Sequence, residues 1–518
     1  MGLMRAAMIA AFFIVAKASV LSAQEVTLTT PDGNLSISGT VLGFDGALYR
    51  LSTDYGELTV DGTRLVCVGD GCQDPETYVA DVQISGSAAL GGVLMPALIE
   101  AFALRNDLRA TRETLDDSHF TYRIANKDGR DLGLFRFRVT TTDEGFADLL
   151  ADEADIAMAL REVRSAEAKL AREAGLGRLR GVNRSRVLAL DALLPVVAAR
   201  NPVKGISLAG LAQVLSGKID NWQAFGGPDA PINIYLPEGQ TGLSQSIEDR
   251  LLRPANLKFT QDISRHPTNR DVTQAVSGDP HGLGIASFSD LGTTRALTLI
   301  GTCGFSQSAT RRSVKTEDYP LTTPLFLYLP ARRLPELARD FLTFTRSQTA
   351  QIVIRRTGFV DQAPEEIPVS LQGDRFVNAI RVAGDVGGLD GLREMTQSLS
   401  GMRRLTTSFR FEPGSAGLDA QSRSNVQQLA RALEAGRYDN RKLVFVGFSD
   451  GQGPADTNLT IAARRAMVVR DAVLSAAKTA RMDSIEIETD AYGEAMPMAC
   501  DDTSWGRQVN RRVEVWLQ

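Results

Sequence analysis

The sequence contains few of the residues that most often build catalytic and metal sites. Its 518 residues include three histidines and four cysteines. His119, His266 and His281 stand singly, without the spacing of a set of metal ligands. No cysteine or serine is grouped with a histidine as an activated nucleophile would be. We therefore expect no metal site, no cofactor and no enzymatic activity.

Long basic, Gly/Ser-rich and Pro-rich tracts are also missing, and their absence excludes several classes of protein. The formal net charge is −5 and there is no basic tract, so we expect no nucleic-acid partner. Because long Gly/Ser or Pro tracts are absent, a flexible tether between domains is not expected. Hydrophobic residues make up 43% and charged residues 23%, as in ordinary globular domains. A chain of this length is too long for one core, so we expect several domains.

A short apolar run near the N-terminus predicts the compartment. Arg5 precedes the run at residues 6–16, and small residues follow it, as in a secretory signal peptide. The run is shorter than the about 20 apolar residues that span a bilayer, and Lys17 interrupts it. A retained membrane anchor is the alternative. No cysteine precedes Cys67, which excludes a lipid-modified cysteine at the cleavage site. We expect a signal peptide at residues 1–23 and a mature periplasmic protein.

The four cysteines of a protein in an oxidising compartment are candidates for disulfides. Cys67 and Cys72 enclose a turn-rich tetrapeptide, which favours a local bridge. Cys303 and Cys500 lie in what we interpret as different domains. A bridge between them would lock those domains together, and two buried free thiols are the alternative.

Residues 24–76 predict a small β module. Its hydrophobic residues alternate in short runs that Asp-Gly turns interrupt, a pattern typical of hairpins. The expected strands are residues 26–29, 35–37, 47–51 and 58–60. We expect a barrel-like or an open sheet with a role in packing or protein contact.

From about residue 80 the pattern changes to strands that alternate with amphipathic helices. Residues 82–84 predict a strand, Ser85, Gly86 and Ser87 predict a turn, and residues 97–102 predict the helix that follows. A strand, a glycine turn and a helix N-terminus form an α/β unit in which an anion can bind.

Residues 77–363 resemble the phosphate-type periplasmic substrate-binding proteins. The stretches that carry the resemblance are collinear and comprise residues 154–158, 201–203, 216–222, 226–227, 282–286, 319–321, 325–328, 347–348 and 358–360. The resemblance implies a periplasmic-binding-protein fold, in which two α/β lobes joined by hinge strands close on a ligand. It also leaves an ABC transporter open as a partner.

The expected cleft departs from what a dehydrated phosphate requires. The loop that carries an arginine in the family aligns with residues 236–242, which contain none. In the second loop Thr141 and Thr142 precede Asp143 and Glu144, whose charges would repel an anion. The candidate cleft residues are Ser85, Gly86, Ser87, Thr141, Arg161, Glu238 and Thr241.

These residues predict an altered cleft that takes a cationic or neutral small ligand, or that docks a partner protein. Phosphate is the alternative if Arg161 or Lys218 reaches the site. Residues 364–406 predict a packed connector with two short helices, at about residues 375–383 and 389–400.

Residues 407–518 carry the most specific pattern of the chain. Asp450 is followed by Asn458 at a spacing of eight and by Arg465 at fifteen, and the chain closes on residues 510–514, Asn-Arg-Arg-Val-Glu. This segment resembles the OmpA-like peptidoglycan-binding domain, an α+β fold. The resemblance implies that an aspartate and an arginine bind the two charged ends of diaminopimelate in the stem peptide.

The chemistry of these residues suits a free amino-acid end. Asp450, at the end of an expected strand, can accept from an ammonium group, and Arg465 can bind a carboxylate through two parallel N–H groups. Asn458, near the start of an expected helix, either fixes the loop or donates to the carboxylate.

The whole chain therefore predicts a multidomain periplasmic protein of the solute-binding type, anchored non-covalently to peptidoglycan and associated with the cell wall. An envelope scaffold that uses its binding-protein fold for protein contact is the alternative. An outer-membrane component is left open as a neighbour or partner. A wall hydrolase lacks any acid/base pair or nucleophile in this sequence.

Overall fold

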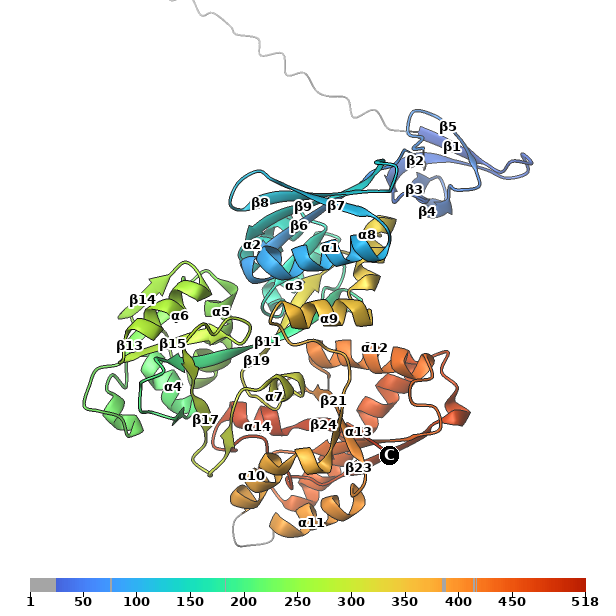
Figure 1. Cartoon of the computed structure of the whole chain (residues 1–518). Coiled ribbons are helices and arrows are strands. Elements are labelled where there is room, and N and C mark those ends of the chain that lie inside the picture. The colour runs from blue at the N-terminus through green and yellow to red at the C-terminus, as the bar shows by residue number, and fades with distance from the viewer. Residues whose placement is uncertain (1–24, 75–76, 182, 384–387, 413–414, 416) are drawn as a thin grey trace, which may run out of the picture. The chain divides into compact units, whose positions relative to one another are not determined.

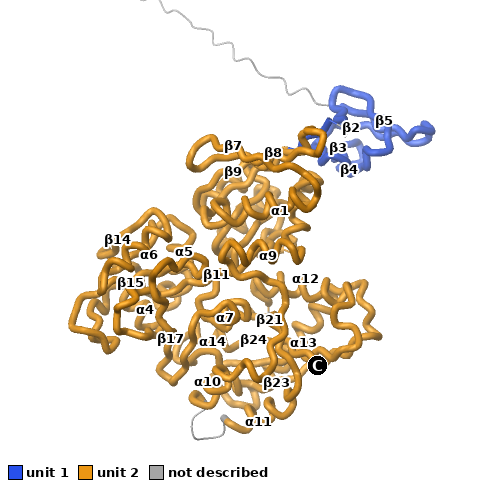
Figure 2. The backbone as a smooth tube through the Cα atoms, viewed as in Figure 1, with its two compact units in different colours: residues 1–80 blue, residues 81–518 orange. Residues whose placement is uncertain are grey.

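The computed structural model describes residues 25–518, with the exception of 75–76, 182, 384–387, 413–414 and 416. It forms two units, residues 1–80 and residues 81–518 (Figure 2). The expected signal peptide at residues 1–23 lies outside the described residues. Within the described part of the chain, no helix is long and apolar enough to cross a membrane.

The first unit is an antiparallel sheet of five strands in the order β4-β3-β2-β1-β5. The strands are β1 Glu25–Thr29, β2 Ser36–Phe44, β3 Leu48–Thr53, β4 Gly56–Asp61 and β5 Val66–Val68. Val26, Leu28, Tyr49 and Leu51 form its buried core. The expected disulfide joins Cys67 to Cys72, which closes the end of β5.

The second unit begins with the two lobes that the sequence resemblance implies. Their sheet runs in the order β14-β13-β15-β11-β19-β10-β6-β9-β8-β7. The long strands β11, Ser185–Val197, and β19, Thr322–Tyr328, pair with each other and connect the lobes (Figure 1). Both are almost entirely buried, as expected for strands covered on both faces.

The first lobe contains the strands β6 Ala80–Ser87, β7 Arg109–Thr114, β8 His119–Ala125, β9 Asp131–Thr140 and β10 Ile156–Ala159. A wide helical turn, Leu90–Leu94, leads into the first of its helices. These helices are α1 Met95–Arg105, α2 Thr142–Leu150, α3 Ser165–Glu173, α8 Glu336–Phe344 and α9 Gln348–Arg356.

The second lobe contains the strands β12 Gly205–Ile206, β13 Asn233–Pro237, β14 Ile263–His266, β15 Gly282–Ser287, β16 Arg295–Ala296, β17 Thr298–Ile300 and β18 Ser306–Gln307. Its helices are α4 Leu208–Leu215, α5 Gly242–Ile247, α6 Asn269–Gly278 and α7 Arg311–Lys315. Short helical turns lie at Trp222–Phe225, Glu248–Leu252 and Arg253–Ala255.

The segment from Ser85 to Ser87 is the end of strand β6, so the turn expected there was wrong. Gly86 has a φ of +124°, and a Cβ at this position would lie 2.3 Å from the carbonyl oxygen of Met158. Gly86 is therefore required for the close pairing of β6 with β10.

The C-terminal part of the second unit is a five-stranded sheet in the order β20-β21-β24-β22-β23. The strands are β20 Glu366–Pro368, β21 Arg403–Arg410, β22 Lys442–Phe448, β23 Glu486–Ala491 and β24 Arg512–Leu517. The helices are α10 Gly373–Ala383, α11 Gly388–Ser398, α12 Ala420–Glu434, α13 Ala455–Ala476 and α14 Ser504–Asn510. Short helical turns lie at Val369–Leu371 and Met482–Ser484.

Helices cover both faces of this sheet. Leu429 of α12 and Val469 of α13 pack on one face, with Phe445 of β22. Leu392 and Met395 of α11 pack on the other face, where Trp516 of β24 is fully buried. The two helices expected in the connector are thus present as α10 and α11, and they complete the core of the C-terminal sheet.

Covalent and ionic contacts join the C-terminal domain to the binding-protein fold. A disulfide links Cys303 to Cys500, the interdomain pairing that the even cysteine count favours. Arg404 of β21 donates to both carboxylate oxygens of Asp318, which precedes β19, at 2.6 and 2.9 Å. These contacts hold the C-terminal domain against the lobes.

Candidate binding sites

The serines expected in the cleft are used inside the first lobe. Ser85 is buried, and its hydroxyl donates to the carboxylate of Asp148 on α2. Arg138 of β9 donates to the same carboxylate at 2.6 Å. Ser87 is buried as well. The single proton of the Ser85 hydroxyl is therefore engaged inside the lobe.

The two threonines of the expected cleft cap helices. Thr141 accepts a hydrogen bond from the backbone N–H of Glu144 at the start of α2, at 3.2 Å. Thr241 accepts from the N–H of Ser244 at the start of α5 and donates to the carbonyl of Glu238 at 2.8 Å. The Glu238 side chain is exposed. Both hydroxyls therefore satisfy free groups of the backbone, as N-cap residues do.

Arg161, the expected anion ligand, is bound by the protein itself. Its side chain is 4% exposed and pairs with Glu167 at 2.6 Å and with Asp143. Its Nε donates to Oε1 of Gln245 at 3.2 Å. Burial lowers the pKa of Arg161, but hydrogen bonds to Glu167 and Asp143 outweigh it, so the pKa is raised.

Asp143 joins the two lobes. It lies at the N-terminus of α2 in the first lobe, and its carboxylate accepts from Nε2 of Gln245 on α5 in the second lobe, at 2.6 Å. The same carboxylate receives Arg161. The negative charge of Asp143, which the sequence predicts at this place, thus pairs with Arg161. Asp143 accepts the hydrogen bonds of Arg161 and Gln245 that an anionic ligand would need.

The lobes also meet directly beside this carboxylate. Ser246 of α5 donates to the carbonyl of Leu160 at 3.0 Å. A Cβ on Gly242 would lie 2.6 Å from the hydroxyl oxygen of Thr142, so only glycine fits there without a shift. The N-termini of α2 and α5 are therefore in contact.

The C-terminal domain has a second candidate site at the end of β22. The Asp450 side chain is 13% exposed and pairs with Arg511 at 2.8 Å. Arg465 of α13 lies with its guanidinium 5.4 Å from the centre of the Phe411 ring. No described residue accepts a hydrogen bond from Arg465. Burial, followed by the nearby charge of Arg511, lowers the pKa of Arg465, and Asp450 opposes this shift.

A cavity of about 340 Å³ adjoins these arginines. Arg464, Arg465 and Arg511 line it, and Ile461 and Val468 form an apolar wall. The site therefore has a carboxylate close to two guanidinium groups, as a ligand with both an ammonium and a carboxylate would require.

Asn458 has a supporting position. It is buried in the first turn of α13, and its Nδ2 donates to Glu494 at 3.2 Å. It therefore joins the helix to the loop after β23. Asp501 fixes the adjacent loop by accepting from the N–H of Gly451 at 2.7 Å.

Sequence reasoning missed the role of Arg511. Arg511 belongs to the closing Asn-Arg-Arg motif, and this motif is the sequence feature that could have indicated its role. Antiparallel pairing sets Phe448 of β22 opposite Arg512 of β24, so that Arg511 comes beside Asp450. Among the described residues, no group of three or more histidine, cysteine, aspartate and glutamate side chains is arranged to hold a metal ion.

Two family models match the chain. The PBP superfamily domain matches residues 75–349, and the OmpA family matches residues 410–511.

Curated proteins match each part. The phosphate-binding protein PstS of Borreliella burgdorferi is 26% identical over 181 residues, 34% of this chain and 64% of that protein. Protein SphX of Synechococcus elongatus is 28% identical over 235 residues, 43% of this chain and 67% of that protein. The peptidoglycan-associated lipoprotein of Agrobacterium fabrum is 33% identical over 106 residues, 20% of this chain and 56% of that protein. The chain thus spans between about half and two thirds of these relatives.

Solved structures match the lobes as well. A putative phosphate ABC transporter substrate-binding protein with bound phosphate, from Clostridium perfringens, has 21% sequence identity and a TM-score of 0.42. The match covers 54% of this chain and 99% of that one.

Proposed function

The chain belongs to the PBP superfamily, and we propose that it is a periplasmic protein of the solute-binding type that holds peptidoglycan non-covalently through its OmpA domain. The observation that carries the proposal is the group formed by Asp450, Arg511 and Arg465. Of these, Arg465 faces a cavity and has no hydrogen-bond acceptor among the described residues.

In this proposal the ligand is the diaminopimelate residue of the stem peptide. Asp450 accepts from its ammonium group, and Arg465 binds its carboxylate through two parallel N–H groups. Arg511 orients Asp450, while Asn458 holds the loop through Glu494. The likeness to a peptidoglycan-associated lipoprotein supports this ligand and a location in the cell envelope.

We also propose four folded parts in the mature chain. They are the β module at residues 24–76, the two lobes at 77–363, the connector at 364–406 and the OmpA domain at 407–518. The pairing of β20 with β21 and the packing of α10 and α11 support a connector that belongs structurally to the C-terminal sheet. Such a connector keeps the lobes close to the wall.

The substitution Asp450→Asn tests the proposed peptidoglycan site formed by Asp450, Arg465 and Arg511, called the wall site below. The substitution keeps the size of the side chain but removes the charge that attracts the ammonium, so we expect about tenfold or greater loss of retention on purified sacculi. Asp456→Asn, on the exposed first turn of α13, is the matched control and should be retained as the wild type is. Equal retention of both variants would falsify the proposal.

The cleft between the lobes is, in this proposal, retuned away from phosphate. The carboxylate of Asp143 supports this, because it already receives Arg161 and Gln245. Calorimetry with inorganic phosphate on the mature wild-type protein should detect no tight binding. Phosphate would have to displace the Asp143 carboxylate, which is part of the protein and cannot leave the site. Micromolar or tighter binding at this cleft would rule out the retuned cleft.

An envelope scaffold is the second candidate function. The contact between α2 and α5, together with the disulfide from Cys303 to Cys500, favours a rigid body over a lobe pair that opens and closes. Crosslinking in cells separates the candidates, because a scaffold should give one stoichiometric protein partner.

A further inference from the structure

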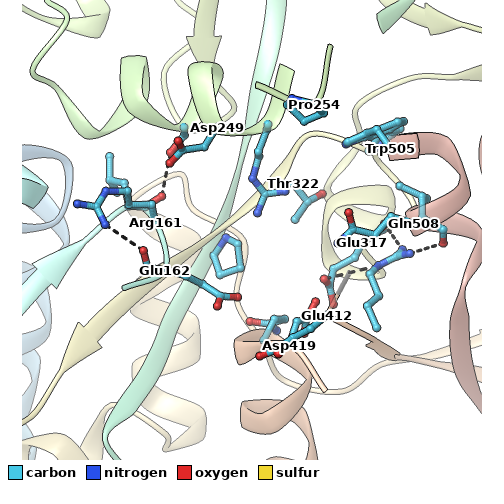
Figure 3. Close-up of a pocket in the computed structure, with 18 of the residues that line it drawn as sticks. Arg161, Glu162, Asp249, Pro254, Glu317, Thr322, Glu412, Asp419, Trp505 and Gln508 are labelled. Atoms are coloured by element: carbon cyan, nitrogen blue, oxygen red, sulfur yellow. Dashed lines mark hydrogen bonds and ion pairs between the residues drawn. The ribbon is translucent and has the colours of Figure 1, made fainter. Parts of the chain in front are cut away.

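A second cavity, of about 550 Å³, lies where both lobes and the C-terminal domain meet. Figure 3 shows that its walls come from all three, with Glu162 from the first lobe, Asp249 from the second lobe, and Asp419 and Trp505 from the C-terminal domain. Its volume falls in the range of about 300–1,000 Å³ that is usual for small-ligand sites.

Glu317 is the most unusual residue of this cavity. Its side chain is 10% exposed, and the nearest described cation is Nε of Arg410, at 3.8 Å. No described residue donates a hydrogen bond to its carboxyl group. Burial raises the pKa of Glu317 to about 8, although Arg410 opposes the shift.

The backbone of Glu317 is also strained. Its φ is +57°, in the left-handed region that residues other than glycine seldom adopt. Arg410 of β21 donates to the carbonyl oxygen of Glu317 and so holds this conformation. The Glu317 carboxyl group therefore lines the cavity without a described hydrogen-bond donor.

Besides Glu317, four residues with carboxyl groups line the cavity, namely Glu162, Asp249, Glu412 and Asp419, and two of them accept backbone hydrogen bonds. Glu162 accepts from the backbone N–H of Ala420 at 3.2 Å, and Asp419 accepts from the N–H of Ser422 at 2.8 Å. Burial is the main cause of a raised pKa in both groups. Carboxyl groups from three parts of the chain therefore converge on one space.

Positive charge comes from four arginines in the lining. Three of them, Arg161, Arg180 and Arg410, donate to described acceptors, and Arg250 is the exception. It lines the same cavity, and no described residue accepts a hydrogen bond from it. Burial lowers its pKa, and the charges of Glu162, Glu317, Asp419 and Asp249 oppose that shift. The wall thus contains a guanidinium without an acceptor and a carboxyl group without a donor.

We propose that this cavity binds a small zwitterion, a free amino acid or a short peptide, with its carboxylate at Arg250 and its ammonium between Glu317, Glu162 and Asp419. Asp249 and Glu412 already pair with Arg253 and Arg423. An inorganic anion would satisfy Arg250 but face the other three carboxyl groups, and a simple cation would leave Arg250 unsatisfied. A zwitterion satisfies both groups, because a buried charge is stable only when it is paired.

The proposal does not rest on the wall site. Asp450 and Arg465 do not line this cavity, so zwitterion binding should survive Asp450→Asn. Loss of sacculus binding and loss of zwitterion binding are therefore separate results.

The test is calorimetry on the mature full chain with the common L-amino acids and the alanyl dipeptides. We expect at least one of these to bind. Its N-acetylated form, which lacks the ammonium, and its amide, which lacks the carboxylate, should each bind about tenfold or more weakly. Binding of peptides alone or of amino acids alone distinguishes the two sources of the ligand.

Two variants locate the site. Arg250→Gln and Glu317→Gln should each weaken binding about tenfold or more, and Arg270→Gln, at an exposed position in the second lobe, should not. If one variant does not fold, the other still tests the proposal. The comparison of the N-acetylated and amide ligands uses the wild-type protein and requires no variant. Absence of binding by every zwitterion, equal binding of the blocked forms, or unchanged binding by Arg250→Gln overturns the proposal.

Discussion

Replacing Arg404 by leucine is expected to lower the free energy of unfolding by about 3–5 kcal/mol, because it leaves buried carboxylates without their main partner. The Arg404 side chain is 1% exposed and lies between Asp318 of the binding-protein fold and Glu514 of β24, at 2.6 and 3.1 Å. Burial raises the pKa of Glu514, but Arg375, Arg404 and Arg512 outweigh it and lower the pKa to about 2.

Urea denaturation of the full chain measures this effect. The control is Arg403→Leu, one residue earlier on the same strand. That side chain is 53% exposed and its ion pair with Glu366 is 3.8 Å long, so a change of no more than about 1 kcal/mol is expected. Similar small changes in both variants would show that the network does not hold the two domains together.

Arg465→Ala is expected to reduce retention on purified sacculi by about 100-fold, because it removes the fork that binds the ligand carboxylate in a half-buried site. Arg465→Lys keeps the charge but loses the two parallel N–H bonds, so an intermediate loss of about tenfold is expected. Co-sedimentation with sacculi at a series of protein concentrations measures both.

Arg470→Ala is the control for this pair. It lies on the same helix, and its described ion pair is with its own neighbour Asp471. We expect its retention to equal that of the wild type. If Arg465→Ala also retains full binding, Arg465 is a helix residue without a role in recognition.

The proposed wall site of Asp450, Arg465 and Arg511 was the candidate site most accessible from the sequence. Asp450 and Arg465 are fifteen residues apart on one strand–helix unit, so local structure alone brings them close. Arg511 was missed because it reaches Asp450 only through the pairing of β22 with β24. Arg404 lies within the expected connector, and nothing in the sequence indicates its partner Asp318, which is 86 residues away.

The cleft was less predictable for the same reason. Ser85 and Arg161 have the chemistry of ligand residues, but the protein takes up their hydrogen bonds. Asp148 receives Ser85, while Asp143 and Gln245 receive Arg161 together with the sequence neighbour Glu167. The charge of Asp143 was expected to repel a ligand anion, and the structure adds that this charge is itself bound across the lobes. Composition and periodicity carry no information on such pairings.

In the proposed function, the C-terminal domain recognises the two charged groups of diaminopimelate. The most direct test compares retention of the wild-type protein on sacculi that contain diaminopimelate with retention on sacculi that contain lysine at the same position of the stem peptide. Lysine has no carboxylate beside its terminal amine, so Arg465 would have no ligand. We predict that the protein binds sacculi with diaminopimelate and does not bind sacculi with lysine. Equal binding to both would contradict recognition of diaminopimelate by Asp450 and Arg465.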